Sequence, residues 1–142
     1  MAQNLVICGV SAEVTERIKK LKISKSKTNN AVVLKVDLES RQIVLDEEYE
    51  DTSIEELQNE LPSHRPSYVF LSYEYKHDDG RISYPFIFIF ISPSGCKPEM
   101  QMMYSGSKLN LVKETEVSKV FEIRSTEDLT EEWLLEKLKF FR

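Results

Sequence analysis

The sequence has few of the residues that build metal, redox or disulfide sites. Its 142 residues include two cysteines, Cys8 and Cys96, and two histidines, His64 and His77. The cysteines form no CxxC pair, and no histidines stand near them at the spacing of zinc ligands. A folded chain of this length buries enough surface to be stable without disulfides or metals. We therefore expect no cofactor and no metal, and a reducing compartment suits the chain.

Long hydrophobic stretches are missing too. The longest apolar run spans residues 86–91, far below the roughly 18 residues of a membrane-spanning helix. Residues 1–10 lack a basic start followed by a long apolar segment, so they do not predict a secretory signal. These absences predict a cytoplasmic protein that inserts into no membrane.

The excess of acidic residues argues against nucleic acid as the main partner. The chain has 24 Asp and Glu against 19 Lys and Arg, a net charge of −5, whereas nucleic-acid-binding surfaces are usually basic. The charge is uneven: residues 1–30 hold six basic and two acidic residues, and residues 37–60 hold ten acidic and one basic. This pattern predicts a polarised molecule whose basic segment, with Arg17, Lys19 and Lys20, steers toward an acidic protein surface. An ordinary solvated helix face is the alternative.

The chain contains no repeat, low-complexity tract or flexible linker, so residues 1–142 are expected to form a single domain. Residues typical of helix N-termini, together with apolar residues at helical spacing, predict four helices. These begin near Ser11, Ser53, Pro98 and Leu129. The third is expected to reach about Thr115 and the last Phe141. Runs of β-branched and aromatic residues predict strands at 31–37, 42–48, 68–75, 82–91 and 120–124.

The order of these elements predicts the fold class. The first two strands and the next two are expected to form hairpins, the second through the Asp-Gly pair at 79–80. Residues 86–91 do not alternate with polar ones, which is typical of a central strand covered on both faces. The long helix that follows makes strand 120–124 parallel to that central strand. We expect an α/β protein with a central mixed β-sheet flanked by helices on both faces.

A search for catalytic motifs finds none. The chain has no GxSxG elbow, and His64 stands in a polar loop with no visible partner. Residues 94–97 read Ser-Gly-Cys-Lys but are followed by Pro98, so they do not complete a phosphate-binding loop. A helix N-terminus lowers a thiol pKa, which leaves a reactive Cys96 as an alternative, although no second cysteine or base stands nearby. We expect a protein without enzymatic activity.

Residues 77–79 are open to two interpretations. His77, Asp78 and Asp79 could hold a cation or act as an acid and a base, but Asp-Gly turn chemistry also accounts for them as a solvated hairpin tip. We favour the turn.

One face of the long helix is similarly open. With Tyr104 and Leu111 turned inward, helical spacing places another set toward the opposite side: Gln101, Met102, Ser105 and Lys108. Small residues at 105–107 lower helix propensity and allow close approach, either by a partner or by the sheet beneath. The sequence leaves both alternatives open.

Five segments of the chain resemble a known family. They are KTNNAVVLKVD at 27–37, HDDGRISYP at 77–85, SPSGCKPEMQMMYSGSK at 92–108, KVFEIRSTEDLTEEWL at 119–134 and the Phe-Phe pair at 140–141. On these segments the chain is identified as a member of the actin-depolymerising-factor (ADF) homology domain family, and within it resembles the glia maturation factors. The resemblance implies a single ADF-homology domain over residues 1–142, with a central mixed sheet between helices.

The resemblance also implies a function. Similar proteins are non-enzymatic regulators of branched actin that bind the actin-related protein 2/3 complex, inhibit its nucleation activity and promote debranching of filaments. It implies a monomer at the cell cortex and leading edge. There the protein would contact the complex and, at the branch, an adjacent actin subunit.

Carried over by position, the resemblance implies two contact surfaces. The first would insert into the cleft of an actin-related subunit and comprises Asn4, Leu5, Gln101, Met102, Ser105 and Lys108, to which the charge pattern adds Arg17, Lys19 and Lys20. The second comprises His77, Asp78, Asp79, Arg81, Glu131, Glu132 and Glu136.

One departure from the cofilins bears on the choice of partner. Cofilins begin the long helix with two lysines, where this chain has Glu99, Met100 and Gln101. The resemblance therefore implies weak docking on ordinary actin. Two alternatives stay open: a cofilin-like direct actin binder or severing factor, and an intracellular signalling or growth-factor-like protein.

Overall fold

The computed structural model describes residues 9–24 and 27–139. Its eight strands are β1 (Gly9–Val10), β2 (Asn30–Asp37), β3 (Gln42–Tyr49), β4 (Ser67–Ser72), β5 (Tyr75–Lys76), β6 (Ile82–Ser83), β7 (Phe86–Ile91) and β8 (Lys119–Ile123). Its helices are α1 (Ala12–Lys22), α2 (Ile54–Glu60), α3 (Pro98–Thr115) and α4 (Glu131–Leu138), with a 3-10 turn η1 (Thr126–Asp128) before α4.

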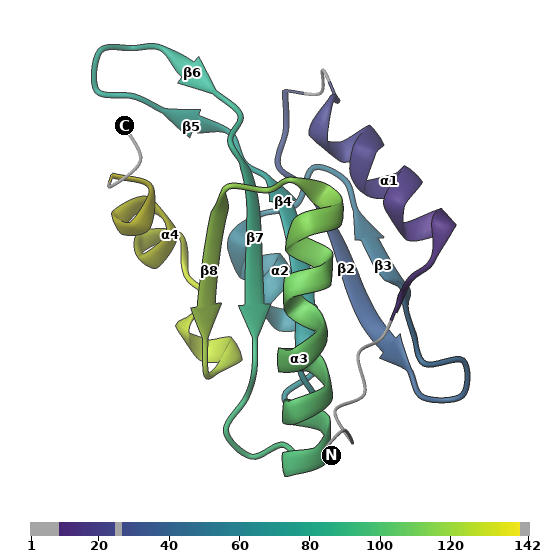
Figure 1. Ribbon diagram of the computed structural model, residues 1–142. Helices are drawn as coiled ribbons and strands as arrows, with labels where there is room; N and C mark the ends of the chain where they lie inside the picture. Colours follow the sequence, from purple (N-terminus) through teal and green to yellow (C-terminus); the bar gives the residue numbers. More distant parts are fainter. Residues whose placement is uncertain (1–8, 25–26, 140–142) are drawn as a thin grey trace.

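Six strands form one sheet in the order β1-β3-β2-β4-β7-β8, and β5 pairs with β6 in a separate ribbon (Figure 1). The central pairs are antiparallel, whereas β8 runs parallel to β7 and β1 runs parallel to β3. The mixed sheet is therefore confirmed, and so is the crossover through α3.

Helices cover both faces of this sheet (Figure 1). One core lies under α1 and α3 and contains Ile18, Phe88 and Tyr104, all nearly inaccessible to water. The other lies under α2 and α4 and contains Leu57, Ile89 and Leu134. Strand β7 contributes to both cores, because alternate side chains point to opposite faces. This confirms the prediction that its continuous apolar run is buried on both sides.

Local signals in the sequence predict where most helices begin. Ser11 caps α1 by accepting a bond from the Val14 N–H, and Pro98 is the first residue of α3. At α2 the predicted capping box is complete, because the Ser53 hydroxyl and the Glu56 side chain each accept the other's backbone N–H. Such caps satisfy the donors that a first turn leaves open.

The second predicted hairpin differs from the structure. Residues 68–75 and 82–91 were expected as continuous strands, but each divides, so that β4 and β7 stay in the main sheet and β5 and β6 form the ribbon. The break falls at Pro85, which lacks the N–H that a ladder needs. One bond still crosses there, from the Tyr73 N–H to the Pro85 carbonyl. Pro85 was the signal for this break.

Two further boundaries differ. Strand β1 was not predicted, because two residues carry no periodicity. The last helix begins at Glu131 rather than Leu129, since Thr130 caps it and Leu129 instead packs into the second core. Its predicted end at Phe141 lies outside the described residues. Within residues 9–24 and 27–139, no helix combines the length and apolar character needed to cross a membrane.

Candidate functional site

Helix α3 is held against the sheet by two tyrosines. Tyr104 is 1% exposed, and its hydroxyl accepts a 3.0 Å bond from the Val36 N–H. The Tyr68 hydroxyl in turn donates to the Tyr104 carbonyl at 2.6 Å, with the two ring centroids 5.2 Å apart. Strand β4 pairs with β2 only as far as Leu34. Beyond that point the Tyr104 hydroxyl, rather than a carbonyl of β4, accepts the hydrogen bond from the Val36 N–H. These bonds fix which face of α3 points to solvent.

The outward face of α3 carries two exposed apolar side chains with a small side chain between them. Met102 is 62% exposed and Leu109 is 61% exposed, and Ser105 between them is exposed as well. These positions fall on one side of a helix, because seven residues make nearly two turns. Met102 and Ser105 therefore face outward as predicted. Leu109 belongs to the same stripe but was not selected from the sequence, although its spacing from Met102 was the available signal.

The other two α3 residues of the predicted set turn toward the sheet edge. The Gln101 amide donates to the Pro93 carbonyl at 2.9 Å. The Lys108 ammonium lies 3.2 Å from a Glu122 carboxylate oxygen and 5.4 Å from the centre of the Phe90 ring. Both side chains are half-buried, so the prediction that they point away from the fold was wrong.

A shallow hollow lies between α3 and β8. The residues that line it are Ser92, Pro98, Gln101, Met102, Ser105, Gly106, Glu122 and Arg124. Three members of the predicted surface thus border one depression, and Ser107, the third small residue at 105–107, packs inward with no exposure. Both alternatives for the small residues therefore apply. Ser107 packs inward, whereas Ser105 and Gly106 border the hollow and leave space for a partner.

The basic residues of segment 1–30 that the structure describes do not form a separate basic region on the surface. Helix α1 packs beside β3, and Arg17 forms a 3.0 Å salt bridge with Glu48 of that strand. Residues from the basic and acidic segments also line one hollow between α1 and β3, including Lys20 and Asp51. The prediction of a polarised molecule was therefore wrong for this region, because folding brings the two segments together.

The structure places the other members of the first surface as follows. Lys19 and Lys20 are exposed on α1, on the same side of the sheet as α3. Arg17 is directed to β3 by its salt bridge and does not join the α3 face. Asn4 and Leu5 lie outside the described residues.

The β5–β6 ribbon closes on itself. The His77 N–H donates to the Arg81 carbonyl at 2.8 Å, and His77 Nε2 lies 2.7 Å from the Ser83 hydroxyl. At the tip, Gly80 has a φ of 91°, which favours glycine. The Arg81 N–H and guanidinium both donate to Asp79, and these bonds lower the pKa of the Asp79 carboxyl. The turn interpretation of residues 77–81 is thereby confirmed.

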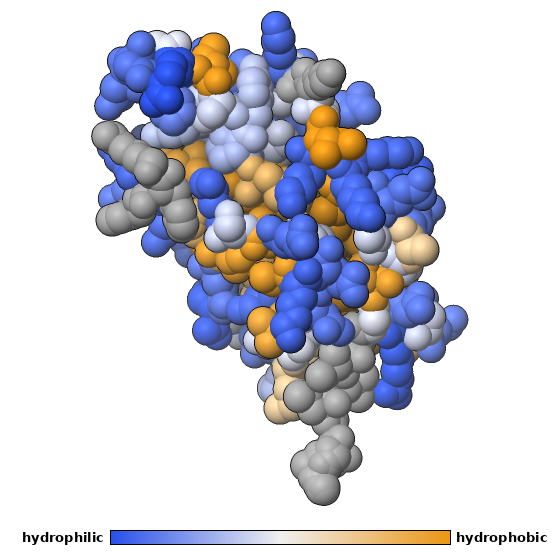
Figure 2. Space-filling view, turned by 45° about the horizontal axis from the view of Figure 1, so that its top comes forward, coloured by the Kyte–Doolittle hydropathy of each residue, from blue (hydrophilic) through white to orange (hydrophobic). Residues whose placement is uncertain are grey.

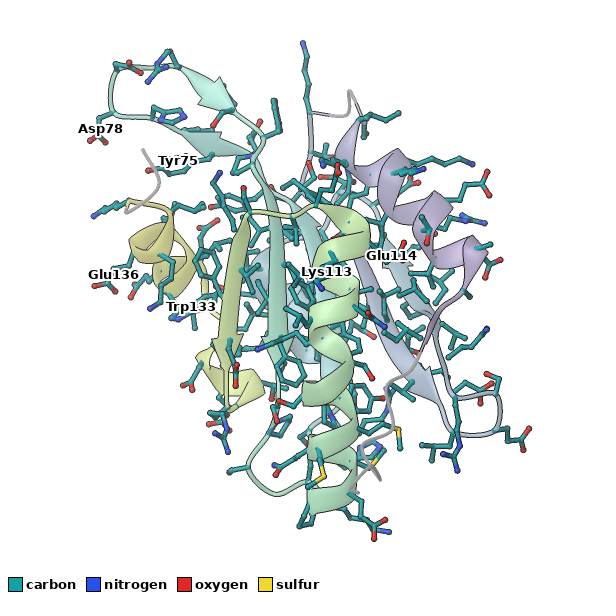
Figure 3. All side chains as sticks on the ribbon, viewed as in Figure 1. Tyr75, Asp78, Lys113, Glu114, Trp133 and Glu136 are labelled. Atoms are coloured by element: carbon teal, nitrogen blue, oxygen red, sulfur yellow. The ribbon has the colours of Figure 1, made fainter. Side chains whose placement is uncertain are left out.

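The acidic residues of α4 divide between two surroundings. Glu131 accepts a 2.9 Å bond from the Tyr73 hydroxyl, and burial together with this carboxylate raises the pKa of Tyr73. Glu132 and Glu136 instead border a hollow beside β8. Figure 3 shows Asp78 on the ribbon and Glu136 on α4 at the same lateral edge of the molecule. The residues of the predicted second surface thus lie on the ribbon and on α4.

Two residues weighed for catalysis, His64 and Cys96, differ in their exposure. His64 is exposed in its loop. Cys96 is 7% exposed, and burial raises the pKa of its thiol, so the alternative of a lowered pKa was wrong. Among the described residues, no three His, Cys, Asp or Glu side chains are grouped to hold a metal ion.

Hydrophobic side chains are scattered on the face seen in Figure 2, where they alternate with hydrophilic ones. The exposed large hydrophobic residues include Ile23, Ile82 and Leu38 besides the α3 pair, and they come from separate elements. Single exposed apolar residues are ordinary on a protein surface. The α3 stripe differs because two of them share one helix face beside a hollow.

Comparisons with known proteins show the family to which the chain belongs. Residues 7–139 match the family model described as cofilin/tropomyosin-type actin-binding protein. Glia maturation factor beta of Homo sapiens is 55% identical over 141 residues, covering 99% of each chain. Glia maturation factor of Drosophila melanogaster is 51% identical over 133 residues, covering 94% of this chain and 96% of that protein.

Solved structures show the same fold. The solution structure of glia maturation factor from Caenorhabditis elegans matches with a TM-score of 0.82 at 44% identity, covering 96% of this chain and 99% of that one. The crystal structure of Plasmodium berghei actin depolymerization factor 2 matches with a TM-score of 0.81 at 26% identity, covering 93% of this chain and 96% of that one. The chain therefore belongs to the glia maturation factors, within the cofilin/tropomyosin-type family of actin-binding proteins, and consists of a single ADF-homology domain.

Proposed function

We propose that this protein binds the actin-related protein 2/3 complex, inhibits its nucleation activity and promotes debranching of actin filaments. Its family membership supports a regulator of actin structures. The observation that carries the proposal is the outward stripe of α3, where Met102 and Leu109 stand exposed on a helix that buried tyrosines fix in place. The action is one of binding in the cytoplasm, at sites of branched actin, and requires no catalytic residue.

A rigid stripe of this kind suits insertion into a cleft. Met is flexible and polarisable, so it fills irregular apolar spaces, while Ser105 and Gly106 allow the partner's backbone to approach. Binding promotes debranching if the protein prefers the dissociated arrangement of the branch, because a ligand shifts an equilibrium by its difference in affinity for the two states. The ribbon and α4 would contact the adjacent actin subunit.

The proposal is tested with a double variant of the α3 face. We expect Met102→Ser with Lys108→Gln to abolish inhibition in a pyrene-actin assay of branched nucleation by the purified complex. A matched control is Leu38→Ser with Lys27→Gln, which changes an apolar residue of similar exposure, 56%, and an exposed lysine that is not part of α3. The control should inhibit like the unaltered protein. Circular dichroism checks that both variants fold.

Two results would count against the proposal. Full inhibition by the double variant would overturn the assignment of the α3 face. Absence of binding between the unaltered protein and the purified complex would overturn the choice of partner.

A second candidate function is favoured by the family itself, whose description is that of actin-binding proteins. In that case the protein would bind or sever actin filaments directly, as cofilins do. Sedimentation with filaments alone discriminates the two functions. We expect the protein to remain in the supernatant with bare filaments and to bind the complex, and the reverse pattern would establish the second function.

A further inference from the structure

Among the described strands, β8 forms one edge of the six-stranded sheet. Strand β8 pairs with β7 on one side, and it ends the strand order of the six-stranded sheet. Within the described part of the chain, no other strand pairs with it. An edge strand presents unpaired N–H and C=O groups that can template another strand. This edge lies on the far side of β8 from β7.

A hollow lies beside this edge, between β8, η1 and α4. Its lining residues are Glu122, Ile123, Arg124, Glu127, Asp128, Thr130, Glu132, Trp133 and Glu136. Three separate elements therefore contribute to one depression. The end of an open strand forms one of its walls, and a helix forms the opposite wall.

The charge of the hollow has one dominant sign. Five of its lining residues carry carboxylates, against the single guanidinium of Arg124. Glu122 pairs with Lys108, but the described residues hold no salt bridge to Glu127, Asp128, Glu132 or Glu136. A second copy of this chain would bring the same carboxylates against them, which is repulsive. The charge therefore favours a basic occupant over self-association.

An aromatic wall and a fixed loop prepare the hollow for an occupant. Trp133 is half-buried and stands edge-on to Phe121 of β8, with ring centroids 5.8 Å apart. Figure 3 shows Trp133 on α4 beside β8. The Gln58 amide of α2 donates to the carbonyls of Glu127 and Leu129, both at 3.0 Å, and so holds the acidic loop in place. Tryptophan is also the best aromatic partner for a cation.

We propose that this hollow binds an extended, Lys- and Arg-rich segment of a partner protein, which adds as a strand to the edge of β8. In this mode of recognition the main-chain bonds supply affinity, and the side-chain surroundings supply specificity. Basic side chains on one side of the added strand would meet the carboxylates of η1 and α4, and one would lie against Trp133. The site shares Glu122 and Arg124 with the hollow beside α3, and Glu132 and Glu136 with the second surface, but it does not include Met102 or Ser105.

The chain carries its own reporter for this site, because Trp133 is its only tryptophan. The probe is a synthetic decapeptide of alternating arginine and valine, titrated against the full chain while tryptophan emission is followed. We expect saturable binding with a change in emission. Glu132→Gln with Glu136→Gln should weaken binding about tenfold, since two exposed ion pairs of modest strength are lost. The charge-matched control, Glu55→Gln with Glu60→Gln on α2, should bind like the unaltered chain.

Strand addition has its own test. Two further peptides carry N-methyl groups on one or the other alternating set of amides. We expect one to lose binding and the other to keep it, because an added strand turns only alternate N–H groups toward β8. Equal binding of both methylated peptides would overturn strand addition. If the α2 variant weakened peptide binding as much as the α4 variant, the peptide would be responding to the net charge of the protein, and the proposed site would be overturned.

Two other outcomes are decisive. Absence of saturable binding would overturn the proposal, as would a dimer of the free protein in analytical ultracentrifugation that the peptide does not disrupt. A Met102→Ser variant should still bind the peptide, since Met102 does not line this hollow. The two surfaces can therefore fail separately.

Discussion

Helix α3 and the β5–β6 ribbon are both candidate contact surfaces, but they are held in different ways. Helix α3 has 18 residues and buries Tyr104, Ser107, Leu111 and Thr115 against the sheet. Each ribbon strand has two residues, and the hydrogen bonds His77–Arg81, His77–Ser83 and Arg81–Asp79 join residues of the ribbon itself. The geometry of α3 thus depends on the core, whereas the geometry of the ribbon depends on its own turn.

This difference predicts how each surface responds to change. A defect under α3 should lower the stability of the whole domain, because its contacts are those of the core. A defect in the ribbon should open the ribbon alone, because few buried contacts join it to the rest. The following predictions test this contrast.

The largest effect is expected from Tyr104→Ala. It removes a buried ring and leaves the Val36 N–H without its acceptor, so the free energy of unfolding should fall by about 3–5 kcal/mol. Urea unfolding measures this loss. Tyr104→Phe keeps the ring and should cost about 1–3 kcal/mol for the unsatisfied group. If Tyr104→Ala cost no more than Tyr104→Phe, the ring would not be what holds α3.

A smaller and local effect is expected from Gly80→Ala. An alanine at a φ of 91° is strained, by about 1 kcal/mol, although nothing crowds its side chain. Hydrogen exchange at the His77 N–H, which bonds to Arg81, should accelerate while urea unfolding changes little. Gly95→Ala is the control, since that glycine also has open space but no positive φ. Acceleration spread over the whole domain would contradict a ribbon that opens alone.

The smallest expected effect is that of low pH on the closure of the ribbon tip. Because bonds from Arg81 lower the pKa of Asp79 below its usual value of 3.8, closure of the tip is favoured at higher pH. This contribution should be lost as the pH falls through the lowered pKa, while the core stays folded. Amide NMR shifts of Arg81 would report the loss, and Asp79→Asn should remove the pH dependence. Asp37 also has a lowered pKa, so a local probe is required.

Much of the α3 surface could be predicted from the sequence. Pro98 marks the start of the helix, and the spacing of Tyr104 and Leu111 identifies its buried side. Met102 and Ser105 follow from that spacing alone. The orientation of Gln101 and Lys108 does not, because their partners, Pro93 and Glu122, are supplied by a loop and by the edge strand.

The sequence by itself determined the local structure: the caps at Ser11 and Ser53, the Asp-Gly turn and the buried run of β7. These signals act between residues a few positions apart, so they can be identified without knowledge of the fold. They were sufficient for the fold class, whereas the family resemblance rests on the five segments quoted above.

Only the tertiary structure decided which distant segments meet. It brought basic α1 against acidic β3, so that Arg17 pairs with Glu48 across 31 positions, and it buried Cys96. It also left β8 at the edge of the sheet, beside Trp133 of α4. The strand order decides these neighbours, and strand order follows from packing the whole core rather than from any local pattern.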